Sequence, residues 1–370
     1  MRLIKLNIHE FRNYEHLSYD AHPRLNLLVG HNGAGKTNFL DAVYYAAVGR
    51  SYFTGLDKEV MRNDSDYMRL DYDLEIRGEK TNVVFKLLRQ KGKKLEVDGV
   101  EIEKLTDFLG VIRVVMMAPQ DAFILLVGNT ERRRWLDQLL CQYDANYALA
   151  LKDYTRLLSR RNAYLKATPP HKADDRLLDT YWDKMEPPAG IIHRLRSELL
   201  NGFDRSVSDY YGIISGHQED VEINYESILD QFSWKDLKDR SRKEEIFSGS
   251  TQHGVHKDKI HFQINARKLK YYGSQGQTKS FFLSLKMAEL DLLSREDDRP
   301  ILLIDDVFAK LDASRIERFF QLLSGLSGCQ IFMTDTNYER LKSLMTTLNM
   351  RGKIQRLRQG RLILGKDEEE

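Results

Sequence analysis

Apolar and polar residues alternate through much of the first 118 positions, with the period of two that is typical of half-buried strands. Residues 25–29, LNLLV, are almost continuously apolar and predict a strand buried on both faces. A helical pattern follows at about 37–47. The other predicted strands in this part of the chain are 3–8, 72–76, 82–88, 94–102 and 111–117.

The pattern becomes helical from about Glu131. Apolar residues recur at spacings of three and four over 131–166, which predicts one long amphipathic helix. Two proline pairs, at 169–170 and 187–188, are expected to break the region into segments because proline lacks an amide donor. A further helix is predicted over 190–212.

Strands and helices alternate again from about residue 245. The patterns predict a strand pair in 259–273, a helix in 278–294 and buried strands in 300–305 and 329–335. This alternation predicts an α/β fold with mixed sheets, interrupted by a helical insertion. We therefore expect a discontinuous domain formed by 1–120 and 245–370, and a compact helical domain at 121–244.

Composition limits the functional classes. Of the 370 residues, 42% are hydrophobic, which is enough to form substantial cores. The 57 basic and 55 acidic residues nearly balance, so net charge gives no argument for a nucleic-acid or membrane partner. No apolar run approaches the ~18 residues of a membrane span, and no signal-peptide pattern is present. Cys141 and Cys329 are isolated and are expected to be reduced thiols, so we expect a cytoplasmic location.

The segment GHNGAGKT, directly after the 25–29 strand, has the spacing of a phosphate-binding loop. In such a loop the backbone N–H groups and the positive end of the next helix face the phosphates. Lys36 is expected to reach the outer phosphates and Thr37 to hold magnesium. Taken alone, the segment also fits an ordinary glycine turn between a strand and a helix. The expected nucleotide-binding residues are Gly30, His31, Asn32, Gly33, Ala34, Gly35, Lys36 and Thr37.

Two further segments favour the nucleotide site. The strand 300–305 ends in Asp305, where nucleotide-binding enzymes carry a magnesium ligand, and the adjacent Asp306 is a candidate to polarise water. The segment SQGQ, 274–277, stands at the start of a predicted helix, where small residues suit an anion. Each has a structural alternative, since buried strands commonly end in aspartate and flexible turns commonly open helices.

The three motifs, in this order and with a helical insertion after the first, resemble those of ABC-type ATPase heads. That resemblance implies that Ser274 and Gly276, followed by Gln277, contact the γ-phosphate of a nucleotide held by a second molecule. Longer stretches resemble the RecF family of bacterial recombination mediators over nearly the whole chain. These stretches are FRNY (11–14), GHNGAGKTNFLDA (30–42), APQDAFILLVGNTERRRWLD (118–137), GVHKD (254–258), 272–289 and 301–312.

The resemblance implies further roles at single positions. It places Gln120 in the loop that senses nucleotide and magnesium, Asp305 as the second magnesium ligand and Asp306 at the catalytic carboxylate. Asp312 then lies in the loop between the two active sites of a dimer. The residues of the FRNY segment that we expect in the nucleotide pocket are Arg12 and Asn13.

The chain departs from the common ABC pattern at three positions. Asp306 stands where a glutamate is usual and is one methylene shorter, so we expect poorer positioning of water and slow hydrolysis. Asp335 replaces the switch histidine and, when ionised, cannot donate a hydrogen bond to a phosphate. Phe53 stands where a basic residue was expected. These changes favour an ATP-gated clamp over a fast motor.

The resemblance also implies a function. ATP with Mg²⁺ would join two heads around DNA, with a preference for gapped or junction-containing duplex. The implied partners are RecR, with RecO, and indirectly RecA, which is loaded in gap repair and replication restart. Two alternatives stay open: a structural chromosome-organising clamp without gap preference, and the ATPase subunit of a membrane transporter.

The length of the insertion limits the kind of ATPase head. From Gln120 to Ser274 is 154 positions. A path out and back leaves about 50–60 helical residues in each direction, or roughly 75–90 Å at ~1.5 Å per residue. The long coiled coils of SMC proteins cannot be contained in it. We therefore expect a compact arm.

Basic residues outnumber acidic ones over 131–166, by eight to four. An excess of this kind suits phosphate contacts that are salt-sensitive and indifferent to sequence. A solvated helix face with i, i+4 pairs is the alternative for each arginine, and residues 132–134 are equally suited to pair with carboxylates of the head. The eight are Arg132, Arg133, Arg134, Lys152, Arg156, Arg160, Arg161 and Lys166.

The segment HGVHKDKIH, 253–261, resembles a metal-binding cluster. If it were a strand, His256 and Asp258 would lie on one face and His253 and His261 on the other. Only His256 and Asp258 match the RecF pattern. A metal is therefore the weaker of the two interpretations.

Overall fold

The computed structural model describes residues 1–295, 298–307, 312–347 and 351–363, and the chain divides into two compact units. The first is Met1–Ala122, Ile213–Ser215 and Phe282–Glu370, and the second is Phe123–Gly212 and Gly216–Phe281. Residues 245–281, which we expected with the first domain, group with the helices, because β9 (Val221–Glu226) pairs with β10 (Lys259–Ile264). Among the described residues, no helix is long and apolar enough to cross a membrane.

An antiparallel sheet forms one layer of the first unit. Its six strands have the order β2-β1-β4-β5-β6-β7. Alternate residues of β4 are buried, in agreement with the period of two in the sequence. The strands are β1 (Arg2–Phe11), β2 (Tyr14–Asp20), β4 (Tyr67–Ile76), β5 (Glu79–Leu88), β6 (Gly92–Val97) and β7 (Val100–Glu101).

A mainly parallel sheet forms another layer of the first unit. Its order is β15-β14-β3-β13-β12-β8, with only β15 antiparallel to its neighbour. All residues of β3, β12 and β13 are buried, as their continuous apolar runs predict. The strands are β3 (Leu25–Val29), β8 (Val114–Met117), β12 (Ile301–Asp305), β13 (Ile331–Asp335), β14 (Gly352–Arg358) and β15 (Arg361–Ile363).

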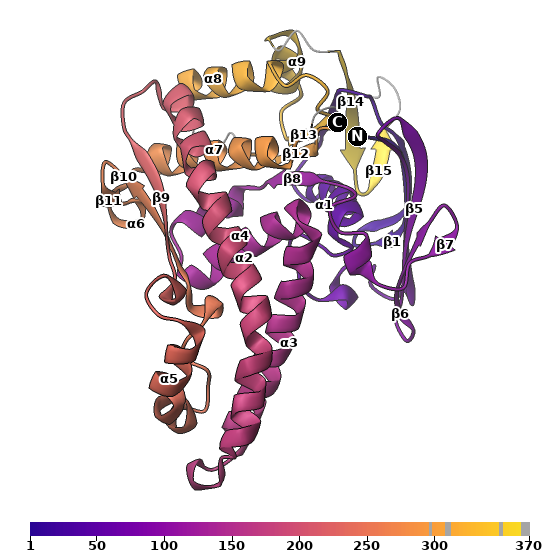
Figure 1. Ribbon diagram of the computed structural model, residues 1–370. Coiled ribbons are helices and arrows are strands. Elements are labelled where there is room, and N and C mark those ends of the chain that lie inside the picture. The colour runs from indigo at the N-terminus through magenta and orange to yellow at the C-terminus, as the bar shows by residue number, and fades with distance from the viewer. Residues whose placement is uncertain (296–297, 308–311, 348–350, 364–370) are drawn as a thin grey trace. The chain divides into compact units, whose positions relative to one another are not determined.

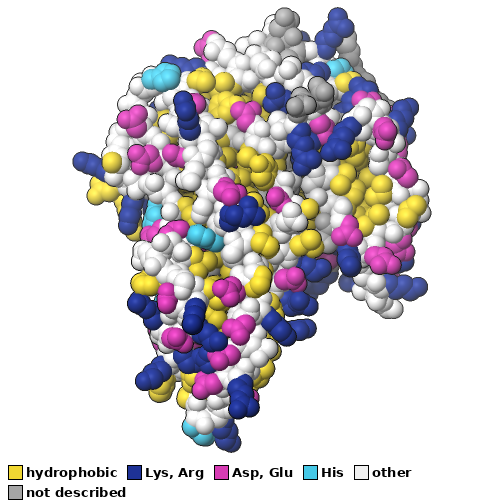
Figure 2. Space-filling view, viewed as in Figure 1, with side chains coloured by type: hydrophobic (Ala, Val, Ile, Leu, Met, Phe, Trp, Pro, Cys, Tyr) yellow, Lys and Arg dark blue, Asp and Glu magenta, His cyan; other side chains and the backbone are white. Residues whose placement is uncertain are grey.

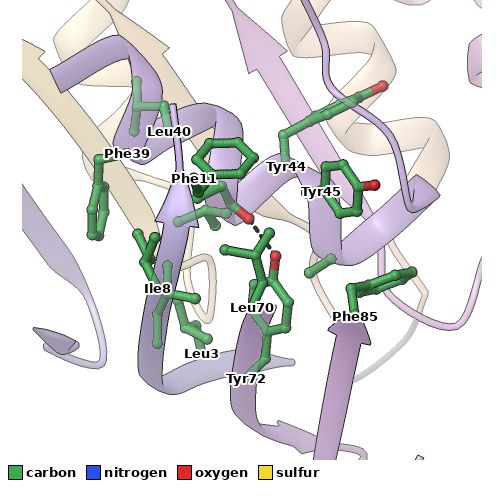
Figure 3. Packing of buried hydrophobic residues seen from close by; sticks show 14 of the residues in the cluster. Leu3, Ile8, Phe11, Phe39, Leu40, Tyr44, Tyr45, Leu70, Tyr72 and Phe85 are labelled. Atoms are coloured by element: carbon green, nitrogen blue, oxygen red, sulfur yellow. Dashed lines mark hydrogen bonds between the residues drawn. The ribbon is translucent and has the colours of Figure 1, made fainter. Parts of the chain in front are cut away.

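The helix α1 (Lys36–Val48) contacts both sheets, through β1 of the first and through β8, β12 and β13 of the second. Helices covered on both sides are apolar all round, and here every residue from Phe39 to Val48 is buried. Figure 3 shows Tyr45 of this helix close to Phe85 of β5, and the Tyr45 ring also contacts Phe11 of β1. The hydroxyl of Tyr72 in β4 donates to the Ala42 carbonyl. The start of α1 is thereby fixed relative to the parallel strands.

The α/β fold with mixed sheets is confirmed. The first unit contains α8 (Ala313–Ser324) and α9 (Tyr338–Thr347), and α7 (Gln275–Leu293) begins in the second unit. The second unit also holds a small sheet of order β11-β10-β9. Its elements are α2 (Asn129–Tyr143), α3 (Ala145–Ala167), α4 (Asp175–Ser215), β9, α5 (Trp234–Ser248), β10, β11 (Arg267–Lys268) and α6 (Leu269–Tyr272). The helices predicted over 190–212 and 278–294 are present in α4 and α7, whereas α5, α8 and α9 were not predicted. Short 3-10 turns occur at 57–59, 105–107, 119–125, 170–172, 228–230 and 255–257.

The single helix predicted over 131–166 is wrong, because the chain forms α2 and α3 there. Asp144 separates them with an extended backbone conformation. Its carboxylate accepts hydrogen bonds from the amides of Asn146 and Tyr147 and so caps the start of α3. The apolar spacing continues through the junction, so periodicity alone did not reveal the break.

The two proline pairs behave differently. The first follows the end of α3, as expected, whereas Pro187 and Pro188 lie inside α4, so the break expected there is wrong. Proline weakens a helix interior by about 3 kcal/mol. Tertiary burial outweighs that cost here, because apolar side chains on both sides of the pair are at most 1% exposed: Trp182, Met185, Ala189 and Ile192. In Figure 1, α3 and α4 run side by side.

Candidate functional site

The glycine-rich loop joins β3 to α1 in the first unit. Gly33 and Gly35 have positive φ values of 81° and 110°, a conformation that side chains other than glycine rarely adopt. Residues 31–33 at its tip are exposed. No side chain caps the helix that begins at Lys36, so its first amides are available to an anion.

Lys36 and Thr37 open α1 beside this loop. The Lys36 ammonium donates to the carbonyls of Gly30, at 2.6 Å, and His31, at 3.0 Å. Burial lowers the pKa of Lys36, and the nearby carboxylates oppose that shift. The Thr37 hydroxyl donates to Oδ2 of Asp305, at 2.8 Å, although the two residues are 268 positions apart. Two motifs recognised separately in the sequence therefore meet in one place.

Asp305 ends β12 and is held from two sides. Besides Thr37, the hydroxyl of Thr334 donates to its Oδ1 at 2.6 Å, from the paired position on β13. Carboxylate and hydroxyl oxygens are the ligands that Mg²⁺ prefers, so Thr37 and Asp305 are suited to hold it. Thr334 was not predicted, although it lies within a predicted strand.

Asp306 has a φ of 43°, which is uncommon for a residue other than glycine and is typical of functional sites. Burial raises the pKa of its carboxyl, the neighbouring Asp335 raises it further, and Arg340 lowers it. The side chain is 40% exposed and therefore remains accessible to water.

Asp335 ends β13 and is completely buried. Both of its carboxylate oxygens accept from Arg340 of α9, with Nε at 2.6 Å from Oδ2 and a terminal nitrogen at 2.5 Å from Oδ1. The same terminal nitrogen lies 3.7 Å from Asp306 Oδ1. Arg340 was not predicted. The sequence did contain a signal for it, because Arg340 is a cationic residue that closely follows the predicted buried strand 329–335.

The FRNY turn contacts the phosphate loop. A Cβ at Gly35 would lie 2.6 Å from Nδ2 of Asn13, and the Tyr14 hydroxyl donates to the Gly35 carbonyl at 2.8 Å. Arg12 instead pairs with the buried Asp41 of α1, with Nε at 2.9 Å. The structure therefore brings Asn13 to the loop and turns Arg12 toward the body of the helix.

Gln120 is exposed in the 119–125 turn, and no hydrogen bond joins it to Thr37 or Asp305 in the part of the chain that the structure describes. The next residue, Asp121, accepts the Ala118 amide at 2.8 Å and fixes the turn. Asp312 caps α8 by accepting the Arg315 amide at 2.9 Å. In this conformation Gln120 therefore lies in a turn that its neighbour Asp121 holds, and Asp312 caps the start of a helix.

The SQGQ segment forms a reciprocal cap at the start of α7. The Ser274 amide donates to the Gln277 side chain at 2.7 Å, and the Gln277 amide donates to the Ser274 hydroxyl at 3.2 Å. Gln277 also donates to Glu219, at 2.8 Å. Ser274 is exposed and Gly276 is half-buried, so this helix start is accessible.

The histidine cluster is not a strand. Residues 255–257 form a 3-10 turn, so the expected distribution over two faces is wrong. His256 hydrogen-bonds the Tyr154 hydroxyl at 2.7 Å and the Thr251 carbonyl at 3.1 Å. No group of three or more histidine, cysteine or acidic residues is arranged to hold a metal within the described residues.

The basic residues of 131–166 differ in burial, from buried through the half-buried Arg133 to exposed. Arg132 and Arg161 are at most 8% exposed. Arg132 donates to the Ile260 and Leu125 carbonyls and Arg133 to the Asp258 carbonyl, so they pair with backbone rather than with head carboxylates. Figure 2 shows acidic and basic side chains interspersed over the visible face. The exposed basic residues are Arg134, Lys152, Arg156, Arg160 and Lys166.

Comparison with known proteins agrees with this geometry. The family model described as RecF/RecN/SMC N terminal domain matches residues 2–356. The DNA replication and repair protein RecF of Phocaeicola vulgatus is 34% identical over 359 residues, covering 96% of each chain. That of Porphyromonas gingivalis is 36% identical over 351 residues, covering 94% of this chain and 95% of the relative.

Solved structures give the same result. A structure of the recombination mediator protein RecF-ATP in the RecFOR pathway has a TM-score of 0.86 and 27% identity, covering 98% of this chain and 96% of that one. An SMC head bound to the C-winged helix domain of ScpA has a TM-score of 0.56 at 12% identity, covering 98% and 96%, and shares the fold alone. The chain therefore belongs to the RecF family of DNA replication and repair proteins, whose heads have the ABC-type ATPase fold.

Proposed function

We propose that this chain is an ATP-dependent DNA-binding clamp that dimerises on ATP and hydrolyses it slowly. The observation that carries the proposal is the 2.8 Å contact between Thr37 and Asp305, because it joins the phosphate loop to the acidic strand end. The similarity to a RecF-ATP structure supports ATP as the nucleotide.

The residues at the edge of the parallel sheet fit both ATP and Mg²⁺. Lys36 would exchange its bonds to two loop carbonyls for bonds to the outer phosphates. Thr37 and Asp305 would hold the metal, which when bound neutralises charge on the phosphates. Asp306, with its raised pKa, would orient water, and its short side chain is the reason to expect slow hydrolysis. Gln120 and Asn13 would complete the pocket, the former after movement of its turn.

Dimerisation would use the start of α7. Ser274 is exposed, and the N-terminal amides of this helix favour an anion. In the proposed dimer, Ser274 and Gly276 would contact the γ-phosphate of ATP held by a second copy, with Asp312 near the junction of the two sites. This arrangement makes closure depend on ATP rather than ADP.

DNA would be bound by the exposed basic residues of α2 and α3. Contacts of this kind are made to phosphates and weaken as salt is raised. As the RecF family implies, we propose gapped or junction-containing duplex as the preferred DNA, and RecR, with RecO, as the partner. The outcome would be loading of RecA in gap repair and replication restart.

Light scattering tests the clamp. The solution mass should double with ATP but not with ADP, and Ser274→Arg should abolish the doubling while retaining ATP binding. Ser159→Arg, which places the same charge on an exposed serine of α3, is the matched control and should dimerise normally. A monomer under every condition would rule out the ATP-driven dimer and require that the mechanism be abandoned.

A further inference from the structure

A buried carboxylate stands at the position where ABC-type heads commonly carry a switch histidine. Asp335 is 0% exposed, and its two oxygens accept from Nε and a terminal nitrogen of Arg340, at 2.6 and 2.5 Å. Its Oδ1 also accepts the amide of Asn337, at 2.8 Å. The carboxylate therefore holds the guanidinium in one plane and is itself fixed by the end of β13.

This pair lies next to the phosphate loop. β13 runs parallel to β3, with Asp335 paired to Val29, and the Asp335 carbonyl lies 3.4 Å from the amide of Gly30. The guanidinium also approaches Asp306, with 3.7 Å between a terminal nitrogen and Oδ1. Arg340 therefore lies at the edge of the parallel sheet where β3 leads into the phosphate loop, β12 ends in Asp305 and Asp306 follows it, and β13 ends in Asp335.

Arg340 retains capacity for a ligand. A guanidinium has five N–H donors and the planar shape that matches a phosphate. Asp335 accepts hydrogen bonds from Nε and one terminal nitrogen of the guanidinium, and the Arg340 side chain is 44% exposed. The carboxylates of Asp305, Asp306 and Asp335 surround Lys36, and their negative charge opposes the approach of a polyphosphate, so a second cation beside Lys36 would favour its binding.

We propose that Arg340 recognises the γ-phosphate of the bound nucleotide and that Asp335 positions it. The proposal rests on the proposed function, in that the loop must hold ATP. Arginine would supply a full positive charge and more than one donor, where histidine supplies one donor. Asp335, which cannot itself donate to a phosphate, then acts only through Arg340. The contact would be absent with ADP, so Arg340 would set the preference for ATP.

Nucleotide affinity measures this directly. Dissociation constants of ATP and ADP are compared for the full chain with Mg²⁺, by equilibrium binding under conditions in which ATP is not consumed. Arg340→Gln should weaken ATP by about 10- to 100-fold, as expected for a lost charged hydrogen bond, and change ADP by less than about twofold. Arg340→Lys should restore part of the ATP affinity, because it keeps the charge but not the fork. Arg299→Gln is the matched control, since it removes another Arg–Asp pair of the first unit.

Removing Arg340 alone leaves Asp335 buried without its cation, which destabilises the fold. The double variant Asp335→Asn with Arg340→Gln avoids this, since both partners become neutral. It should bind ADP like the wild type and still lack the preference for ATP.

Three results would overturn the inference. If the double variant binds ATP as tightly as the wild type, Arg340 only neutralises Asp335, and the proposed function stands. If ATP and ADP weaken equally in Arg340→Gln and in the double variant, the residue supports the loop and does not sense the γ-phosphate. If the wild type binds neither nucleotide, the inference and the proposed function fail together.

Discussion

Two clusters of arginine and aspartate, one in each unit, use the same residue types in opposite ways. In the first unit Arg340 is 44% exposed and bonds to Asp335 at the edge of the parallel sheet. In the second unit Arg196 of α4 is 2% exposed, and its guanidinium contacts Asp137, Asp258, the Tyr147 hydroxyl and the Val255 carbonyl. The first cluster has donors available to a ligand, and the second uses its donors within the protein.

The difference teaches how to separate a site from a structural network. The partners of Arg196 come from α2, α3 and the segments flanking the small sheet, so the network joins elements that are distant in sequence. Asp258 is satisfied further by Tyr225 and Ser227. Burial with full satisfaction indicates structure, whereas partial exposure beside a strained residue such as Asp306 indicates function.

The largest expected effect comes from breaking the buried network. Arg196→Ala should lower the free energy of unfolding by about 3–5 kcal/mol, because it leaves the buried carboxylate of Asp258 and the half-buried carboxylate of Asp137 without their cation. Denaturant unfolding followed by circular dichroism measures it. Arg194→Ala is the control on the same helix, where an exposed pair with Glu198 contributes at most about 1 kcal/mol. Equal effects of the two substitutions would mean that the network is not structural.

A smaller effect, dependent on pH, is expected at His256 beside this network. Burial lowers the pKa of His256 to about 4, from 6.5 in the unfolded chain. The unfolded chain therefore binds more protons between these values, so stability falls as pH drops from 6.5 toward 4 and is unaffected above 6.5. At pH 4.5 the loss from this group should be about 2–3 kcal/mol.

Unfolding at pH 7 and pH 4.5 measures this loss. His256→Gln should show a smaller difference between the two pH values than the wild type, while His171→Gln, at an exposed position, should match the wild type. An unchanged pH dependence in His256→Gln would show that other groups cause the acid sensitivity.

The smallest effect on stability should come from the phosphate loop. Lys36→Ala removes two hydrogen bonds to loop carbonyls, so the free energy of unfolding should change by less than about 1.5 kcal/mol. ATP binding should nevertheless weaken by about 10- to 100-fold, as calorimetric titration can measure. A large loss of stability with little loss of ATP affinity would place Lys36 in the structural class with Arg196 and contradict the comparison.

The sequence by itself determined the chemistry of the first unit. Continuous apolar runs identified the buried strands β3, β12 and β13, and glycine spacing identified the phosphate loop, because both signals are local. The α/β class and the RecF resemblance followed from these motifs and their order. Lys36, Thr37 and Asp305 were recognised as a set before their positions in space were known.

Tertiary structure decided which residues act together. Only folding brings Thr37 within 2.8 Å of Asp305 and places Arg340 against Asp335. Burial also overrode local signals, since α4 continues through Pro187 and Pro188 while a single capping residue, Asp144, divides the helix expected over 131–166. The physical reason is that glycine, proline and apolar spacing act within a few residues, whereas desolvation and charge pairing depend on groups that distant segments supply.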